Sequence, residues 1–514
     1  MMSIHRFEQS ISEKHLLAWI IVISTVLRLI AASTTSLGND EVYYFTYAVQ
    51  PDWNHFDHPP LVGLFIRLFT FNLTMVNEVT VRLAAIAGAA LNTWLIARAG
   101  MLLLNYRAGI IAGLLYNVCI YTSIISGTFI IPDSIQLTFW LLALLTALES
   151  VTTASPQQLT RKLIFFGLYT GLAMMCKIHG AFLWYGMLGF IVFQKPSWLK
   201  NRGLYIGLLI SIAIISPIVL WNIDNDFITW RFHSERVEVN QGLNFKSFLV
   251  TTIGQIAYLN PVIFVTIIFA WIQYKSAWIK NDMFSLLMWI SLPIIICTLV
   301  ISMFRATLPH WSGPGFIGLL LLTAVSVASN TSLLLKKLIS ISVAFTFFVF
   351  LAGPLLINFY PGTLSPATDD KLGEGDFTLD MYGWNQLLPA FQKIQKQDIA
   401  DGVMSAEAPM IVHKWFPGAH VVYYTAYPLK IPVRGVGHMQ DLHKFVWMNQ
   451  LSEPLYKGEN AYFITTSNNF AEPVTLFAEH FARIEKAKTI TQQRSGKVAR
   501  YWHVYRLYDA KKCL

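Results

Sequence analysis

Long apolar runs separated by short polar loops dominate the first 358 residues of the chain. Each run is close to the roughly 20 residues that cross about 30 Å of hydrocarbon. We expect the first run to stay as an uncleaved anchor, because it is long and further spans follow it. The pattern predicts a polytopic α-helical membrane protein with about eleven spans, at roughly residues 15–33, 79–104, 108–128, 131–149, 161–176, 178–194, 203–221, 248–272, 283–304, 311–328 and 335–357.

The loops differ in charge on the two sides of the membrane. If the N-terminus lies inside, the inner loops carry most of the Lys and Arg residues, among them Arg161, Lys162, Lys336 and Lys337. Such an excess of cations marks the cytoplasmic side of a membrane. We therefore predict a multi-pass protein of the cytoplasmic (inner) membrane with a cytoplasmic N-terminus.

The chain after residue 358 is more polar than the part before it. An odd number of spans places this part in the periplasm or an equivalent space outside the cytoplasm. Residues 474–488 have a helical pattern, and four runs have a strand pattern. The sequence predicts a membrane domain, 1–358, and a small extracytoplasmic α/β domain, 359–514, with strands near 410–412, 421–425, 461–465 and 501–507.

Composition supports the membrane interpretation. Hydrophobic residues make up 54% of the chain and charged residues only 13%, against about 25% charged in soluble proteins. The net charge of +9 does not indicate nucleic-acid binding, because the cations lie in short loops instead of one long soluble stripe. The four cysteines lack the spacing of a zinc site, and we predict no disulfide framework.

Acids, histidines and cations gather in the predicted outer loops. The first loop carries Asp40-Glu41 and, further on, Asp52-Trp-Asn-His-Phe-Asp57-His58-Pro-Pro. Later outer segments carry Pro132-Asp133, Lys177-Ile-His179, Arg231-Phe-His233 and Arg305 followed by His310-Trp311. The inner loops carry little beyond Lys and Arg. This distribution predicts that the chemistry takes place on the outer face.

Each acid of these loops has two alternative roles. The pair Asp40-Glu41 at the interface is placed to act as a base toward an acceptor hydroxyl; the alternative is a helix cap, in which Asn39 or Asp40 accepts bonds from the first turn. Asp133, at the outer end of a span, is either a functional acid or a helix cap. Asp57 and His58 start an amphipathic helix too short to span, and they are also candidates to bind a metal or an anion.

The outer cations run against the usual charge bias of membrane proteins. Lys177, Arg231 and Arg305, with His179 and His310 beside them, either pair with the loop acids or form a cradle for a phosphate in the outer headgroup region. For the set as a whole we favour phosphate binding. No nucleotide-binding motif has a usable context, so we expect a donor carried on a lipid phosphate and no nucleotide.

The first outer loop resembles that of bacterial polyprenyl-phosphate-sugar-dependent glycosyltransferases of the glycosyltransferase C superfamily. Its relatives are the dolichyl-phosphate-mannose protein mannosyltransferase-like and lipid A aminoarabinose transferase-like families. The resemblance rests on Asp40-Glu41-Val-Tyr-Tyr and Asp52 to Pro60, and is supported by Ile131-Pro-Asp133-Ser, Lys177-Ile-His179-Gly, Pro309-His310-Trp and Asp380-Met-Tyr-Gly-Trp384. It covers roughly residues 1–330 well and the C-terminal part loosely.

The resemblance implies an inverting transfer of a sugar from a polyprenyl phosphate to an extracytoplasmic acceptor, which is lipid A, another envelope glycan or a protein. It implies that Asp40 is catalytic, helped by Glu41 or Asp133. The donor phosphate would meet Lys177, His179, Arg231, Arg305 and His310. Some relatives bind a divalent metal, and the matching positions here are Asp57 or His58, together with His233. His58 stands where the aminoarabinose transferases carry a Lys.

Two other classes of protein share some of these features. A transporter or flippase of lipid-linked glycans would also carry intramembrane charges, but more often near the membrane midplane and on broken helices. An assembly protein would leave the loop acids without a role. The gathering of polar residues at one face favours an enzyme, with the lipid bilayer, the lipid-linked sugar and its acceptor as partners.

Overall fold

The chain folds into two compact units. The computed structural model describes residues 2–237, 242–330 and 332–514. The first unit contains residues 1–30, 52–69 and 79–350, and the second contains residues 31–51, 70–78 and 351–514. The second unit therefore joins the C-terminal part to two segments of the first outer loop, which the sequence did not predict.

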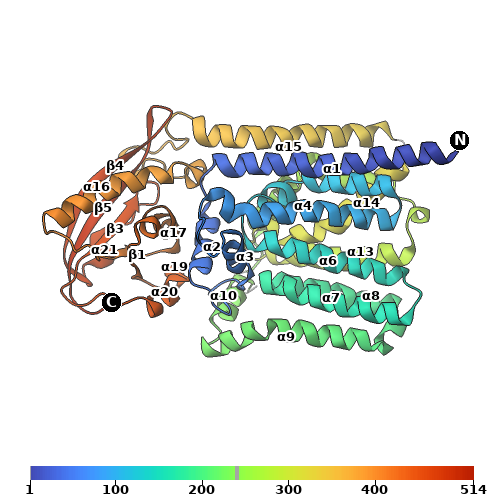
Figure 1. Cartoon of the computed structure of the whole chain (residues 1–514), viewed down its shortest axis with the longest axis horizontal. Coiled ribbons are helices and arrows are strands. Elements are labelled where there is room, and N and C mark those ends of the chain that lie inside the picture. The colour runs from blue at the N-terminus through green and yellow to red at the C-terminus, as the bar shows by residue number, and fades with distance from the viewer. Residues whose placement is uncertain (1, 238–241, 331) are drawn as a thin grey trace. The chain divides into compact units, whose positions relative to one another are not determined.

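The first unit is a bundle of helices, and the prediction of a multi-span helical membrane protein is confirmed. Within the described residues, seven helices are long and apolar enough to cross a membrane. Figure 1 shows α4, α6, α7 and α9 with their axes roughly parallel. The seven are α1 (Met2–Thr34), α4 (Glu78–Leu103), α6 (Pro132–Thr152), α9 (Arg202–Asp224), α13 (Asn281–Ser302), α14 (Phe316–Ser329) with the turn before it, and α15 (Leu333–Phe359).

The other four predicted spans are helical, but none of them forms a single helix that is both long and apolar enough to count as a membrane span. The run 248–272 consists of α11 (Phe245–Leu259) and α12 (Pro261–Ile272), which meet at an angle of 90°. Asn260 between them has a positive φ of 78°, and Pro261 lacks the N–H that would continue the helix. The remaining runs fold as α5 (Tyr106–Val118) with a π-helical turn (Tyr121–Ile125), α7 (Pro156–Cys176) and α8 (Ala181–Gln194).

Small residues allow helices of the bundle to touch backbone to backbone. A Cβ atom on Gly167 of α7 would lie 2.2 Å from the carbonyl oxygen of Gly207 in α9. Beside this contact, Trp184 of α8 donates from Nε1 to the Ser211 hydroxyl at 2.9 Å, and Ser211 donates to the Gly167 carbonyl. In hydrocarbon, where apolar burial contributes little, close packing and interhelical hydrogen bonds of this kind hold helices together.

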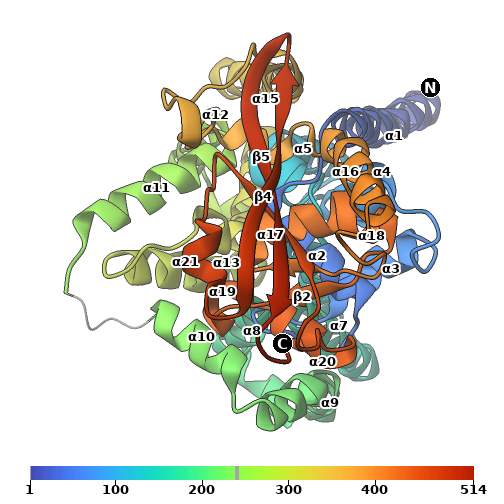
Figure 2. The same ribbon diagram turned by 90° about the vertical axis from the view of Figure 1, so that its left-hand side faces the viewer.

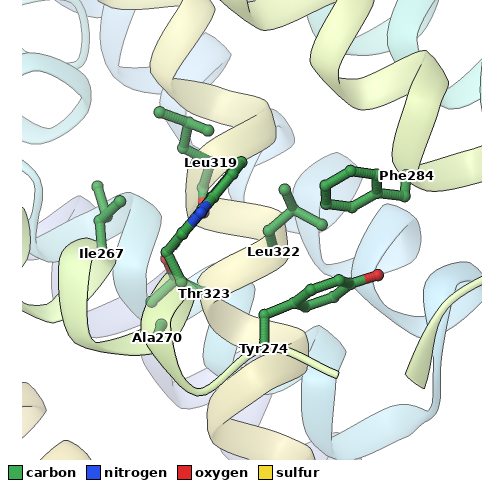
Figure 3. Close-up of a pocket in the computed structure, with 8 residues that line it drawn as sticks. Ile267, Ala270, Tyr274, Phe284, Leu319, Leu322 and Thr323 are labelled. Atoms are coloured by element: carbon green, nitrogen blue, oxygen red, sulfur yellow. The ribbon is translucent and has the colours of Figure 1, made fainter. Parts of the chain in front are cut away.

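An apolar cavity with an empty volume of about 240 Å³ lies between α12, α13 and α14 (Figure 3). Its lining includes Tyr274, Phe284, Leu322 and Thr323, and it contains no acid, histidine or cation. The cavity therefore does not supply the groups that a transfer reaction needs.

Two short helices of the first unit do not span. α3 (Leu61–Phe69) follows Pro59-Pro60, as the amphipathic pattern predicted, and α10 (Ile228–Val237) follows α9. These helices carry or adjoin several of the predicted site residues.

The second unit contains a five-stranded mixed sheet, which confirms the predicted C-terminal α/β fold. The strand order is β2 (Val433–Gly435), β1 (Met410–Val412), β3 (Ala461–Thr466), β5 (Lys497–Ala510) and β4 (Phe481–Arg494). β1 is parallel to both of its neighbours, and β5 is antiparallel to β3 and β4. Figure 2 shows β4 and β5 as one long hairpin.

Two predictions for this unit were wrong. Residues 421–425 are helical, at the end of α17 (Trp415–Val421) and in the π-helical turn Val422–Ala426. This β-branched and aromatic run is buried on all sides, so packing outweighs its preference for strands. Residues 474–488 form a short helix, α21 (Pro473–Phe477), and then enter β4, where pairing along the whole of β5 outweighs the helical pattern.

Helix α2 (Asn39–Val49) packs against α17 within the second unit. Phe45 lies edge-on to Tyr423 at 4.8 Å and to Tyr427 at 5.0 Å between ring centroids. Tyr43 lies 5.3 Å from Trp415. The remaining helices of this unit are α16 (Leu387–Ala400), α18 (Tyr427–Leu429), α19 (Met439–Leu442) and α20 (Phe445–Leu451). The segment that carries Asp40 is therefore packed against the C-terminal fold.

Candidate active site

A buried ion pair forms the centre of the candidate site in the first unit. Asp133 is the second residue of α6, and Lys177 directly follows the last residue of α7. Lys177 Nζ lies 2.7 Å from Asp133 Oδ2, and both side chains are almost inaccessible to water. The acid sits at the positive end of one helix dipole and the cation at the negative end of the other, so both charges are favourably placed.

Neighbouring polar groups complete the surroundings of this pair. Tyr121 donates its hydroxyl hydrogen to Asp133 Oδ1 at 3.2 Å. Gln136, one turn into α6, donates from Nε2 to the Lys177 carbonyl at 2.7 Å. Asp133 therefore accepts hydrogen bonds from Tyr121 and Lys177 and does not act as a simple helix cap. No sequence pattern marks Tyr121 or Gln136, because both lie inside apolar runs.

Two predicted histidines interact electrostatically with Asp133: His179, just after α7, and His310, in the turn before α14. The His179 ring lies 5.8 Å from Trp311, and the His310 ring stacks on Tyr258 at 6.2 Å. The structure thus brings together residues from three predicted outer segments. We call the residues Tyr121, Asp133, Lys177, His179 and His310 the Asp133 cluster.

The first outer loop docks on the segment around α10. Asn54 donates from Nδ2 to the Thr229 hydroxyl at 2.9 Å, and Thr229 donates to the His55 carbonyl at 3.0 Å. Trp221 donates from Nε1 to Asp52 Oδ2 at 3.0 Å. These bonds fix two loops that lie more than 160 residues apart in the sequence.

Asp57, His58 and His233 meet at this junction. His233 Nε2 donates to the Asp57 carbonyl at 2.6 Å, and the His233 ring stacks on His58 at 5.9 Å. Burial lowers the pKa of His58 to about 3 and also lowers the pKa of His233. His58 interacts electrostatically with Lys177 and Asp133, so the junction belongs to the same polar region as the Asp133 cluster.

These three residues do not form a ready metal site. The described residues contain no group of three or more His, Cys, Asp or Glu side chains arranged to hold a metal ion. His233 Nε2 is occupied by a backbone carbonyl, which leaves only Nδ1 as a ligand. The donor set found here therefore does not fit the metal that the resemblance implies.

The two predicted arginines lie on α10 and shortly after the end of α13. Arg231 is exposed on α10 and donates from Nη2 to the Asp226 carbonyl of the same loop. Arg305 follows the end of α13 with a half-buried side chain. Their proposed contact with a donor phosphate remains a prediction.

Asp40 and Glu41 lie in the second unit, in the first turn of α2. Glu41 is buried, and its Oε2 accepts the Gly38 N–H at 2.8 Å, whereas the sequence predicted Asn39 or Asp40 as the capping residue. Asp40 is exposed, and the helix N-terminus stabilises its negative charge.

The turn before α2 is bound to C-terminal residues. Ser36 N–H donates to the Met381 carbonyl at 3.0 Å, and Leu37 N–H donates to the Tyr424 hydroxyl at 2.7 Å. His420 Nε2 donates to the Leu37 and Asp380 carbonyls at 3.1 and 3.0 Å. The Asp380–Trp384 motif noted in the sequence thus has a structural partner in the first outer loop.

Comparison with known proteins agrees with this picture. A family profile described as Dolichyl-phosphate-mannose-protein mannosyltransferase matches residues 57–221, which hold Asp57, His58, Asp133, Lys177 and His179. The matched segment is less than half of the chain, and it agrees with the resemblance noted in the sequence.

Solved structures share the fold of this chain at low sequence identity. ArnT from Cupriavidus metallidurans in the apo state is 14% identical, with a TM-score of 0.63, over 96% of this chain and 98% of that chain. ArnT bound to undecaprenyl phosphate is 15% identical, with a TM-score of 0.63, over 95% and 97%.

A weaker likeness is to the Archaeoglobus fulgidus oligosaccharyltransferase in complex with Zn and sulfate. It is 12% identical, with a TM-score of 0.44, over 80% of this chain and 62% of that chain. No curated protein sequence matches the chain.

The buried pair leads to a prediction about stability. Lys177→Met leaves Asp133 without its cation in a site closed to water, and loss of one partner of such a pair costs about 3–5 kcal/mol. The double variant Asp133→Asn, Lys177→Met removes both charges and should recover most of the lost thermal stability in detergent. Thermal unfolding of the wild type, the Lys177→Met protein and the double variant measures this.

The control is Lys162→Met, which breaks the half-exposed pair with Glu149 and should cost less than about 1 kcal/mol. A Lys177→Met protein as stable as Lys162→Met would contradict the assigned strength of the buried pair.

The buried histidines of the second unit predict a loss of stability in acid. Burial, aided by the positive charge of Arg500, lowers the pKa of His420 to about 3, while an unfolded histidine titrates near 6.5. The stability due to neutral His420 is therefore present above about pH 6.5 and is lost as the pH falls toward 3. At pH 5 the loss is about 2 kcal/mol, and the melting temperature should fall more in wild type than in His420→Gln. Equal falls in both proteins would contradict the prediction.

Proposed function

We propose that the protein transfers a sugar, with inversion, from a polyprenyl-phosphate donor to an acceptor outside the cytoplasm. The acceptor is lipid A, another envelope glycan or a protein. The observation that carries the proposal is the Asp133 cluster, a set of one ammonium and two imidazoles at the ends of membrane-spanning helices. A relative of the same fold is known bound to undecaprenyl phosphate, the class of lipid that such a cluster suits.

The donor phosphate would meet Lys177, His179 and His310, with Arg231 and Arg305 reaching it from their loops. When the bond between the anomeric carbon and the phosphate oxygen breaks, the leaving lipid phosphate gains negative charge. Positively charged and N–H donor groups fixed in a site of low dielectric stabilise that charge more than water would. The leaving group is already an anion and needs little protonation.

Asp40 would take the proton from the acceptor hydroxyl as its oxygen attacks the anomeric carbon from the face opposite the phosphate. This single displacement inverts the anomeric centre. General base catalysis by a positioned carboxylate contributes about 10²- to 10⁴-fold to the rate. Glu41 would act on Asp40 indirectly, by fixing the first turn of α2. Asp133 would contribute to the reaction by holding the Lys177 side chain in place.

The predicted metal ligands Asp57, His58 and His233 lie where the first outer loop meets α10. A metal requirement implied by the resemblance remains a prediction, and activity measured after chelation and after return of Mn²⁺ or Mg²⁺ tests it.

The role of Asp40 leads to a direct test. Asp40→Asn keeps the size and polarity of the side chain but removes the proton acceptor, so kcat should fall by about 10²-fold or more. The measurement is transfer of label from a panel of undecaprenyl-phosphate sugars by the purified protein in detergent. Asp401→Asn, at an exposed acid directly after α16, is the matched control and should keep wild-type turnover. Near wild-type transfer by Asp40→Asn would refute the proposed base.

The proposed orientation places Asp40 and residues 359–514 outside the cytoplasm. Cys513 is exposed, whereas Cys119 and Cys176 are buried and Cys297 is half-buried within α13. A thiol reagent that does not cross membranes should therefore label Cys513 in intact spheroplasts, and a Cys513→Ser protein should stay unlabelled. Labelling of Cys513 only after the membrane is made permeable would contradict the orientation.

A further inference from the structure

The backbone just before α2 has an unusual set of partners within the second unit. Three consecutive residues, Ser36, Leu37 and Gly38, use their N–H groups in hydrogen bonds to the Met381 carbonyl, the Tyr424 hydroxyl and the Glu41 carboxylate. The Leu37 carbonyl accepts from His420. The backbone at the entrance to the helix that carries Asp40 is therefore held on both its donor and acceptor sides.

A side-chain contact adds to these backbone bonds. Asn39, directly before Asp40, donates from Nδ2 to Asp380 Oδ2 at 3.0 Å. The Asp380 carbonyl accepts from His420 and from Trp384 Nε1 at 3.0 Å. His420 thus bridges the turn before α2 and the Asp380–Trp384 motif.

The contacts of the His420 side chain favour one protonation state and one tautomer of its imidazole ring. Both of its Nε2 contacts are carbonyl oxygens, so Nε2 must carry the hydrogen. Its ring stacks on Trp384 at 4.2 Å, and the Arg500 guanidinium covers the Trp384 ring at 4.0 Å. A neutral imidazole with a fixed tautomer is a permanent donor at ordinary pH.

Tyr424 acts as the second bridge. Its hydroxyl accepts from Leu37 N–H and donates to Glu78 Oε1 at 3.1 Å. The Tyr424 ring lies 6.2 Å from the His420 ring and nearly parallel to it. One layer of aromatic groups therefore supports both hydrogen bonds to Leu37.

We propose that His420 and Tyr424 are positioning residues for the transfer reaction: they fix the turn at Ser36–Gly38 and thereby the place of the Asp40 carboxylate. The role rests on the proposed function, because it affects the rate only if Asp40 is the base. A displacement of about 1 Å at a reacting group costs up to about 10²-fold in rate, so hydrogen bonds remote from the substrate matter. The C-terminal fold is then part of the catalytic apparatus and not only a cover or an acceptor-binding domain.

The test for His420 compares two substitutions in the full-length protein. His420→Leu removes the donor and should lower kcat by about 10- to 100-fold with little change in the KM for the undecaprenyl-phosphate sugar. His420→Gln retains an amide donor near the position of Nε2 and should restore most of the turnover. A merely structural role would instead lower the amount of folded protein and leave the kcat of the folded fraction unchanged.

Tyr424→Phe removes one oxygen atom and supplies a test that does not depend on activity. The Leu37 N–H loses its acceptor, so its hydrogen exchange should become faster by about fivefold or more, with a parallel fall in kcat. The matched control is Tyr462→Phe, which removes a buried hydroxyl that donates to Asp398 at 2.9 Å. This control should leave both kcat and the exchange of residues 36–42 unchanged.

The outcomes separate the two proposals. Wild-type kcat in His420→Leu or Tyr424→Phe, or unchanged exchange at residues 36–42, overturns the positioning role. Full activity of Asp40→Asn overturns the base assignment, while the exchange data still show what holds the turn. Loss of kcat in both Tyr424→Phe and Tyr462→Phe, with no difference in exchange, also overturns the positioning role.

Discussion

A carboxylate and an ammonium 2.7 Å apart, both closed off from water, set the main constraint on this structure. Removal of either charge from water is costly, and the pair is tolerable only because the partners meet at short range with further hydrogen bonds. Tyr121 donates such a bond to the Asp133 carboxylate, and Gln136 donates to the Lys177 backbone carbonyl. The start of α6 and the end of α7 must therefore stay adjacent, and the segment after α7, with His179, is placed by that requirement.

The same cost of exposing polar groups to hydrocarbon explains which parts of the fold the sequence predicted. Spans such as α4 and α9 follow from apolar runs of sufficient length, because a helix is the structure that satisfies its own backbone in a bilayer. The 90° break at Asn260 did not follow from hydropathy, since α11 and α12 are both apolar and only Asn260-Pro261 marks the change. Hydropathy indicates which segments are solvated by hydrocarbon, but it says little about the direction in which each helix runs.

The second unit was harder to predict, because packing decides it more than local preference does. The run at 421–425 has strand-forming residues, yet it is helical where it packs against Phe45 of α2. β4 reads as a helix in isolation, and its pairing with β5 determines its actual structure. β1 and β3, which lie at the centre of the sheet and are buried throughout, were predicted correctly.

For the candidate site, the sequence identified residue types and the loops that carry them, but not how they pair. The Asp133–Lys177 contact joins residues 44 positions apart, and nothing in either segment names the other. The resemblance marked the Asp380–Trp384 motif without revealing that its backbone receives His420 and that its carboxylate receives Asn39. Contacts of this kind depend on the fold as a whole.

The two aspartates most prominent in the sequence illustrate how environment divides roles between identical side chains. Asp133 is buried and accepts hydrogen bonds from a cation and a phenol. Asp40 is exposed at a helix N-terminus, on a turn fixed by its own set of hydrogen bonds. Enzymes separate acid, base and electrostatic roles by giving like groups unlike surroundings. In the proposed reaction Asp40 would exchange a proton with the acceptor, while Asp133 holds the Lys177 side chain in place.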